Sequence, residues 1–333
     1  MEKFKKILKI IIYVIAVFTV LSSMFSLFRN AEIRYFKMLD FPRIQLFIIS
    51  LICFAILIFT TNKRNWYNYI ILIGLLISIT INSVFLINYT PLVASQVPLA
   101  KSPFDNNNQL HLLLANVKMS NKNAKSLINL ISINNPDIIL AMETDSWWNN
   151  KLKVLENTYP YFQLKTNEAA YGMSLYSKFP IKEMNIEYLN NKNVPSFQST
   201  ITLPSNKEIA LHCLHPVPPS HFKDLPDNAN QEENALKKIG KRVQNSKLPT
   251  VIAGDLNDVV WSYVDNLTNT KNLLFDVRAG RGFYNSFSAR NIFMRWPLDH
   301  VFVTKEFQLK KIKRLSKIGS DHFPIYIELA LID

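Results

Sequence analysis

Three long uncharged stretches within the first hundred residues constrain the fold of this chain more than any other feature. They run from Ile10 to Phe28, from Ile44 to Asn62 and from Tyr69 to Tyr89, and each is 19 to 21 residues long. An α-helix rises ~1.5 Å per residue, so each stretch matches the ~30 Å hydrocarbon core of a bilayer. The sequence therefore predicts three transmembrane helices within residues 1–89 and an integral protein of the plasma (inner) membrane.

The first stretch also has the charged start of a secretory signal peptide. Lys3, Lys5 and Lys6 precede it and fit the positively charged n-region. The apolar run is longer than the ~7–15 residues of an h-region, and two more spans follow it. We therefore expect a retained anchor.

The flanking cations favour one orientation in the membrane. Six lie before the first span and between the second and third, and five lie in the first loop and after the third span. The six are Lys3, Lys5, Lys6, Lys9, Lys63 and Arg64, and the five are Arg29, Arg34, Lys37, Arg43 and Lys101. Because cytoplasmic loops carry the excess of Lys and Arg, this count places the C-terminal part outside the cytoplasm.

The rest of the chain is predicted to be a linker, residues 90–109, and one α/β (α+β) domain, residues 110–333. Short apolar runs outnumber helical patterns there, so strands should outnumber helices. We expect strands at 111–115, 138–142, 172–177, 198–203, 209–214, 251–253, 298–303 and 325–331, and helices at 123–133 and 230–244.

The charge and the cysteines exclude two classes of protein. Residues 101–333 hold 28 Lys and Arg against 22 Asp and Glu, a formal net charge of +6. This mild excess suits an anionic substrate or lipid headgroups, and it is not the dense basic stripe of a committed nucleic-acid binder. Cys53 lies in the second span and Cys213 in a strand, so no disulfide framework is expected.

Polar residues follow several of the apolar runs. After Val251 to Ala253, Gly254 permits a sharp turn, and Asp255 and Asn257 project to the same side of an extended chain. A turn former explains such a stretch equally well when it is taken alone. Asn116, Glu143 and His215 end other strands in the same way. Together they predict one edge of a sheet lined by polar groups.

Two later motifs complete an ordered series. Asp299 opens the strand at 298–303, and Ser320-Asp321-His322 precedes the last strand. Over residues 110–332 the series resembles the endonuclease/exonuclease/phosphatase (DNase I-like) superfamily. The stretch from Gly172 to Pro180 resembles a hairpin of that family, and 280–287 with 296–302 resembles a membrane-attached bacterial branch. The resemblance implies a four-layer α/β/β/α sandwich of two packed mixed sheets.

The resemblance also implies a role for each residue of the series. Glu143 and Asp321 would bind Mg²⁺ or Mn²⁺, and Asp255 would either bind the same ion or handle a proton. Neutral His322, oriented by Asp299, would be the general base for water. His215 would donate to a phosphate oxygen or to the leaving group, while Asn116 and Asn257 would orient water and phosphate. His212 is the alternative to His215, which we favour because it directly precedes Pro216.

Three arginines are candidates for a second phosphate contact. Arg278, Arg281 and Arg295 lie between the Asp255 and Asp321 motifs, and guanidinium groups bind phosphate in a bidentate manner. Solvated surface arginines are an equally good interpretation.

The sequence thus predicts a membrane-anchored, metal-dependent hydrolase of phosphate ester bonds, a phosphatase or phosphodiesterase. Its substrate would be a phosphate ester or pyrophosphate near the membrane, with lipid-linked substrates among the candidates. One alternative is an extracytoplasmic endonuclease or exonuclease of DNA or RNA. A second is a catalytically dead binding domain, which is disfavoured because every position of the series is filled.

Overall fold

The structure is a computed structural model, and it divides into two compact units, Met1–Asn88 and Tyr89–Asp333. It describes residues 2–31, 34–60, 65–101, 105–220, 226, 234–259 and 272–332. Lys63, Arg64 and the start of the helix expected at 230–244 lie outside these ranges.

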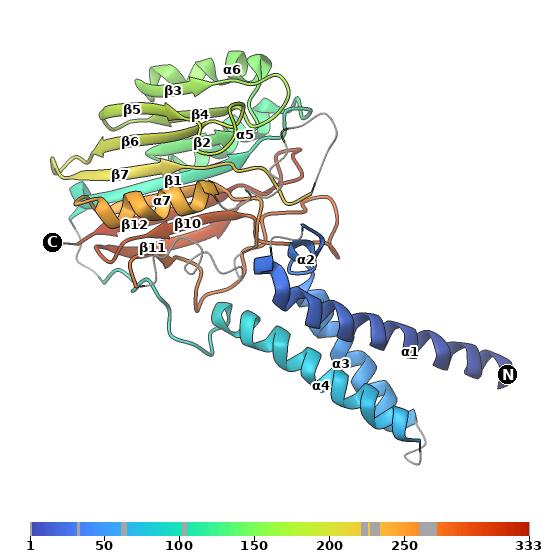
Figure 1. Cartoon of the computed structure of the whole chain (residues 1–333). Coiled ribbons are helices and arrows are strands. Elements are labelled where there is room, and N and C mark those ends of the chain that lie inside the picture. Colours follow the sequence, from blue (N-terminus) through green and yellow to red (C-terminus); the bar gives the residue numbers. More distant parts are fainter. Residues whose placement is uncertain are drawn as a thin grey trace. The chain divides into compact units, whose positions relative to one another are not determined.

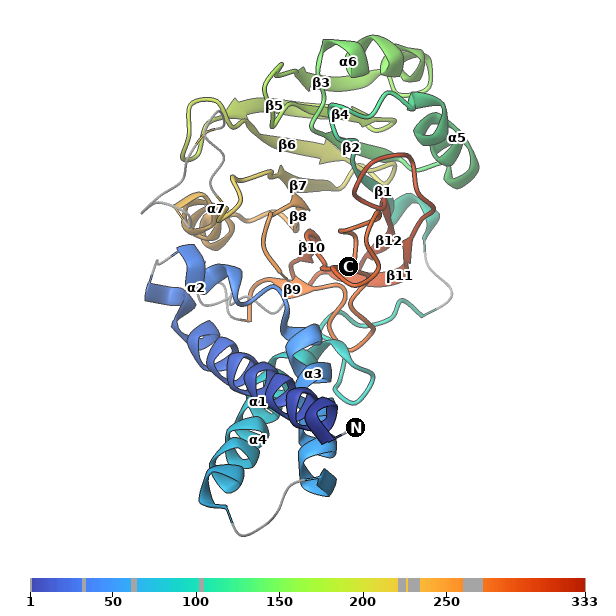
Figure 2. The same cartoon turned by 90° about the vertical axis from the view of Figure 1, so that its right-hand side faces the viewer.

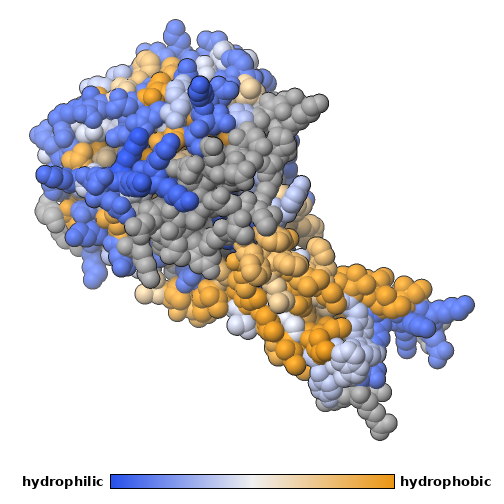
Figure 3. Space-filling view, viewed as in Figure 1, coloured by the Kyte–Doolittle hydropathy of each residue, from blue (hydrophilic) through white to orange (hydrophobic). Residues whose placement is uncertain are grey.

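The first unit is a bundle of helices, and the described segments are α1 (Glu2–Phe25), α2 (Arg34–Met38), α3 (Arg43–Thr60) and α4 (Trp66–Leu86). Three segments, Glu2–Arg29, Arg43–Thr60 and Trp66–Tyr89, are long and apolar enough to span a membrane. Apolar side chains cover most of the visible surface of this bundle, and the hydrophilic start of α1 stands out from it (Figure 3). These features indicate membrane association.

A buried polar network joins the three long helices. Ser78 of α4 is 2.7 Å from the hydroxyls of both Ser23 in α1 and Ser50 in α3. The amide of Asn82 in α4 donates to the Ser23 hydroxyl at 2.9 Å. Small residues that hydrogen-bond across an interface let apolar helices pack closely where hydrophobic burial cannot drive association.

The second unit contains two six-stranded sheets. One has the order β11-β12-β1-β2-β4-β3 and the other β5-β6-β7-β8-β10-β9 (Figures 1 and 2). The first consists of β1 (Gln109–Asn116), β2 (Ile138–Met142), β3 (Tyr161–Lys165), β4 (Met173–Ser177), β11 (Phe307–Arg314) and β12 (Ile325–Leu331). The second consists of β5 (Ile181–Glu187), β6 (Ser196–Thr202), β7 (Glu208–Cys213), β8 (Thr250–Asp255), β9 (Phe275–Asp276) and β10 (Asp299–Val303).

Helices cover the outer face of each sheet, which gives the expected four layers. The helices α5 (Ala124–Asn134) and α6 (Ser146–Leu152) pack on the first sheet, and α7 (Asn234–Asn245) packs on the second. Figure 2 shows α7 on the opposite side from α5 and α6. Both sheets contain parallel and antiparallel pairs, so the prediction of two packed mixed sheets is confirmed.

Apolar side chains point alternately to the two faces of each central strand, so both faces of each sheet are packed. In β1, Leu112 and Leu114 enter the core between the sheets, while Leu113 and Ala115 face the helices. In β8, Val251 and Ala253 face the same central core and Ile252 faces α7. Continuous apolar runs are required because both faces of these strands are buried.

The structure differs from the sequence expectations in two places. Gly172 to Pro180 forms no hairpin, because β4 pairs with β2 and β3 whereas β5 pairs with β6 in the other sheet. Part of the expected linker belongs to the second unit: Leu309 in β11 accepts from Ala100 and donates to Pro98 through its backbone. Gln96 likewise accepts from the Asp276 amide through its side chain at 2.9 Å.

Candidate active site

The candidate site lies where the inner faces of both sheets reach one end of the sandwich. Asn116, Asp255 and Asp299 occupy inner-face positions of β1, β8 and β10, in step with the apolar residues of the central core. Asp299 is directly opposite Asp255 in the antiparallel register of β10 and β8. The polar ends of the strands therefore converge, as the sequence predicts.

Asn116 connects the two sheets. Its side-chain amide donates to Glu143 Oε1 at 2.8 Å and to Asp255 Oδ2 at 3.0 Å. Glu143 directly follows β2 of the same sheet, whereas Asp255 ends β8 of the other sheet. The backbone amide of Asp255 also donates to Met142 Sδ at 3.1 Å. Two carboxylates from different sheets are thus held on one amide.

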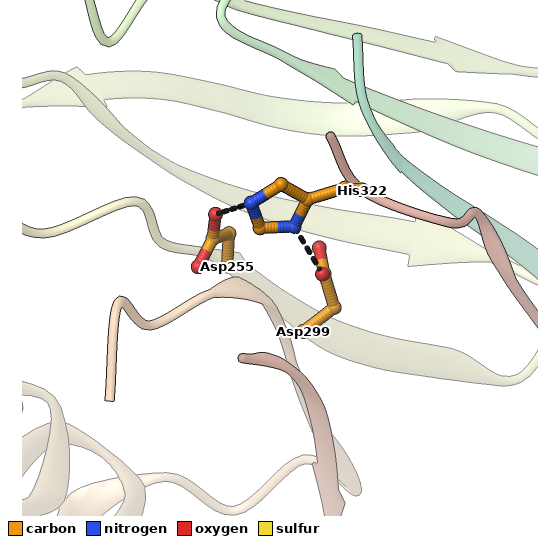
Figure 4. A group of neighbouring side chains, drawn as sticks. All are labelled: Asp255, Asp299 and His322. Carbon is orange, nitrogen blue, oxygen red and sulfur yellow. Dashed lines mark hydrogen bonds and ion pairs between the residues drawn. The ribbon is translucent and has the colours of Figure 1, made fainter. Parts of the chain in front are cut away.

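His322 lies between two buried carboxylates (Figure 4). Its Nδ1 is 2.8 Å from Asp299 Oδ2, and its Nε2 is 3.5 Å from Asp255 Oδ2. Burial alone would lower the pKa of His322, but the charges of Asp255 and Asp299 raise it to about 10. Asp299 thus contacts the ring that it is predicted to orient, and the two carboxylates favour the imidazolium form of His322 over the neutral form assumed in the sequence analysis.

His215 follows β7 by two residues and faces the same carboxylate. Its Nε2 is 3.8 Å from Asp255 Oδ2, and its Nδ1 is buried without a hydrogen-bond partner among the described residues. Burial lowers the pKa of His215, so the ring is neutral at pH 7. The alternative, His212, lies within β7 and pairs with Gln198 and Ile252 in the strand register. The structure thus brings His215 to Asp255 and keeps His212 in the body of the sheet.

Gly254 allows this close approach of β7 and β8. A Cβ atom built on Gly254 would lie 1.8 Å from the carbonyl oxygen of Leu214, and the residue has a φ of 150°. Asn257, with a φ of 52°, donates its backbone amide to Asp255 Oδ1 and its side-chain amide to the Pro216 carbonyl. These two hydrogen bonds of Asn257 hold the loop after β8 against the loop after β7.

Two residues of the site escape the sequence analysis. The Tyr171 ring is 5.1 Å from the His215 ring, and burial followed by the charges of Glu143 and Asp255 raises the pKa of Tyr171. Lys118 forms an ion pair with Asp321. Both residues, like Glu143, have a positive φ. Non-glycine residues held in this region are concentrated at functional sites.

The three arginines have different surroundings. Arg278 is buried, and it donates to the Asp299 carbonyl at 2.7 Å and contacts His300 Nδ1 at 2.7 Å. It supports the start of β10 and leaves no surface for a phosphate, so we do not retain it as a clamp. Arg281 donates to the Val277 and Val97 carbonyls. Arg295 donates to the Ser288 carbonyl at 3.2 Å and lies over the Phe323 ring.

The donor set fits a hard divalent cation. Glu143 Oε1 accepts from Asn116, while no described residue engages its second oxygen, and Asp321 is partly exposed. Carboxylate oxygens are the donors that Mg²⁺ and Mn²⁺ prefer. Asp255, Asp299 and His322 also have donor atoms within 4.8 Å of one another. We do not place the cation among them, because Nδ1 of His322 is hydrogen-bonded to Asp299 and its Nε2 is 3.5 Å from Asp255.

The family model for the endonuclease/exonuclease/phosphatase family matches residues 113–322. The chain belongs to the endonuclease/exonuclease/phosphatase family. This match runs from β1 to His322 and so includes every residue of the candidate site. A comparison with curated protein sequences gives no match.

Solved structures with the fold of this family resemble the second unit. Humanised TDP2 of D. rerio gives a TM-score of 0.55 at 14% identity, covering 67% of this chain and 99% of that one. A family member from Beutenbergia cavernae gives 0.54 at 16% identity, with coverage of 68% and 72%. The catalytic domain of human Nocturnin gives 0.53 at 13% identity, with coverage of 67% and 95%. At these identities the likeness establishes the fold alone.

Proposed function

We propose that this chain is a membrane-anchored phosphoesterase that requires a divalent cation, Mg²⁺ or Mn²⁺. Its family consists of enzymes that hydrolyse phosphate ester bonds. The observation that carries the proposal is the contact of one Asn116 amide with both Glu143 and Asp255. This contact joins the partly exposed Glu143 carboxylate to the buried Asp255 carboxylate. A cation on Glu143 would therefore lie next to a proton acceptor, Asp255.

The cation would be held by Glu143 and Asp321, with Asn116 orienting Glu143. When bound, it would neutralise phosphate oxygens and favour the ionisation of water. The sequence left open whether Asp255 binds the metal or handles a proton, and we assign it the proton. Burial raises the pKa of Asp255 above the usual range of an aspartate, which makes it a stronger acceptor of a proton from water.

His322 would stabilise negative charge on the phosphate. Its imidazolium is fixed by Asp299 through Nδ1, and its Nε2 lies beside Asp255. A preorganised cation in a dry site stabilises developing charge more than it would in water. Neutral His215 can donate a hydrogen bond to a phosphate oxygen or to the leaving group. Asn257 would hold the loop that carries Asp255.

The membrane spans suggest a substrate at the bilayer surface, such as a phospholipid or a lipid-linked pyrophosphate.

The nuclease alternative has one supporting observation, since a structure of D. rerio TDP2 with the same fold was solved "complexed with single strand DNA product" at 16% identity. We place the active unit outside the cytoplasm. Whole protein in nanodiscs, assayed with Mn²⁺ on phospholipid, isoprenyl pyrophosphate and plasmid DNA, tests which of these is cleaved.

Glu143→Gln tests the dependence on a cation. The change keeps the shape of the side chain and removes its charge, so turnover should fall by at least on the order of 100-fold with little change in thermal stability. Glu183→Gln, on edge strand β5, is the matched control and should retain activity. Full activity of Glu143→Gln in EDTA would refute the metal-dependent mechanism.

A further inference from the structure

Lys118 brings a positive charge to the candidate metal position. It follows β1 by two residues, its backbone amide donates to Asn116 Oδ1 at 3.0 Å, and its φ is 55°. Its ammonium group pairs with Asp321 across 203 positions of sequence. No other side chain among the described residues pairs with this ammonium group. The same short segment therefore holds Asn116 against Glu143 and Lys118 against Asp321.

A structural ion pair does not account for this arrangement. The side chains of Lys118 and Asp321 are 30% and 19% exposed. Partly exposed ion pairs add little stability, less than a non-glycine residue in the left-handed region costs. The strained backbone is better explained by a function that requires the ammonium group at this point.

We propose that Lys118 competes with the divalent cation for Asp321 and, once the cation binds there, becomes a ligand of the substrate phosphate. The inference rests on the phosphoesterase function proposed above. A lysine ammonium and a divalent cation both need the Asp321 oxygens, and they repel each other at this distance. A lysine displaced from Asp321 stays tethered at the candidate site, because its backbone amide is held by Asn116 Oδ1, and ammonium groups are effective phosphate ligands.

Two lysines of the same segment provide a matched pair of variants. Lys122 forms a similar ion pair with Asp145 at 2.7 Å, four residues beyond Lys118. We would titrate the whole protein in detergent with Mn²⁺ alone by calorimetry. Lys118→Met should bind Mn²⁺ about twofold to fivefold more tightly than wild type, the range expected for a partly exposed ion pair. Lys122→Met should bind it as wild type does.

A second titration uses inorganic phosphate in the presence of saturating Mn²⁺. Lys118→Met should bind phosphate about tenfold more weakly, because one charge-assisted hydrogen bond is lost. Lys118→Arg keeps a cation and should recover most of this affinity. Unchanged or weaker Mn²⁺ binding by a folded Lys118→Met protein, or unchanged phosphate binding, would overturn the inference.

These measurements separate the inference from the proposed function. Tighter Mn²⁺ binding and weaker phosphate binding in Lys118→Met, with no ester hydrolysed by wild type, would retain the role of Lys118 and refute the enzyme. Hydrolysis by wild type, together with unaltered Mn²⁺ affinity in Lys118→Met, would support the enzyme and refute the role of Lys118. Wild type that binds no Mn²⁺ would refute both.

Discussion

At the residue scale, the site is organised around His322, whose ring lies between Asp255 and Asp299. Two carboxylates face the imidazole, one at each nitrogen, and both stabilise its charged form. His322 in the folded protein therefore keeps its proton up to a pH of about 10, where its pKa lies. Activity that depends on the imidazolium should be lost above this pH and kept below it.

Asp299→Asn tests this assignment. The variant removes one of the two charges that raise the pKa of His322, so the pKa falls. The alkaline limb of the pH–rate profile should move to lower pH, and turnover should fall by about tenfold to 100-fold because the ring is less well oriented. Mn²⁺ affinity should remain near that of wild type, since Asp299 is not proposed as a ligand.

A shift of the acidic limb instead would restore the interpretation made from the sequence, in which neutral His322 accepts the proton. Weakened Mn²⁺ binding in Asp299→Asn would mean that Asp299 is a metal ligand. A profile with neither limb moved would show that the ionisation of His322 does not govern the rate.

The sequence was informative about residues that end apolar strands. Side chains alternate between the two faces of a strand, and Asn116, Asp255 and Asp299 fall on the same face as the core residues of their strands. Their positions can therefore be predicted from the two-residue period of a strand. Lys118 and Tyr171 follow no such pattern, and their partners are distant in the chain. Only the packing of the two sheets brings them to the site.

At the element scale, the sequence predicts all eight central strands and misses the four edges, β3, β5, β9 and β11. Central strands such as β2 and β8 are buried on both faces, and apolar residues make up most of their length. Edge strands carry charged or short segments that discourage pairing with other chains. Exposed lysines and glutamates interrupt β5 and β11 in this way. Charged residues that prevent an edge strand from pairing with another chain also interrupt the apolar pattern by which a strand is predicted.

Residues 93–100 pack against the rest of the second unit, and Gly280 lies against Val93 and Ser95. A Cβ on Gly280 would lie 2.8 Å from Ser95 Cα and 2.9 Å from the Val93 carbonyl oxygen. Gly280→Ala should therefore reduce the free energy of unfolding by about 1–3 kcal/mol more than Gly282→Ala does. Gly282 shares a positive φ, but its nearest neighbour would be a Tyr284 side-chain atom at 3.4 Å. Thermal denaturation of both variants gives the comparison, and equal losses would show that the 93–95 contact adds no stability.

At the scale of the whole molecule, the orientation in the membrane decides which substrates the enzyme meets. With three spans, the count of six cations against five predicts that the C-terminal unit lies outside the cytoplasm. A reporter that is active only in the cytoplasm, fused after the C-terminal residue, should give no signal. The same reporter fused before the first residue is the control and should be active. A strong C-terminal signal would reverse the topology.

The close packing of residues 93–100 also bears on whether the enzyme can leave its membrane. Surface enzymes are shed when a protease cuts an extended, mobile segment beside the anchor. The third candidate span ends at Tyr89, and hydrogen bonds to β11 and to Asp276 hold the chain from Gln96 to Ala100. Between Tyr89 and the contact of Val93 with Gly280 only Thr90–Leu92 remain. Across residues 89–101 a protease would thus find little to cut, and we expect that cleavage in this segment does not release the second unit from a membrane anchor.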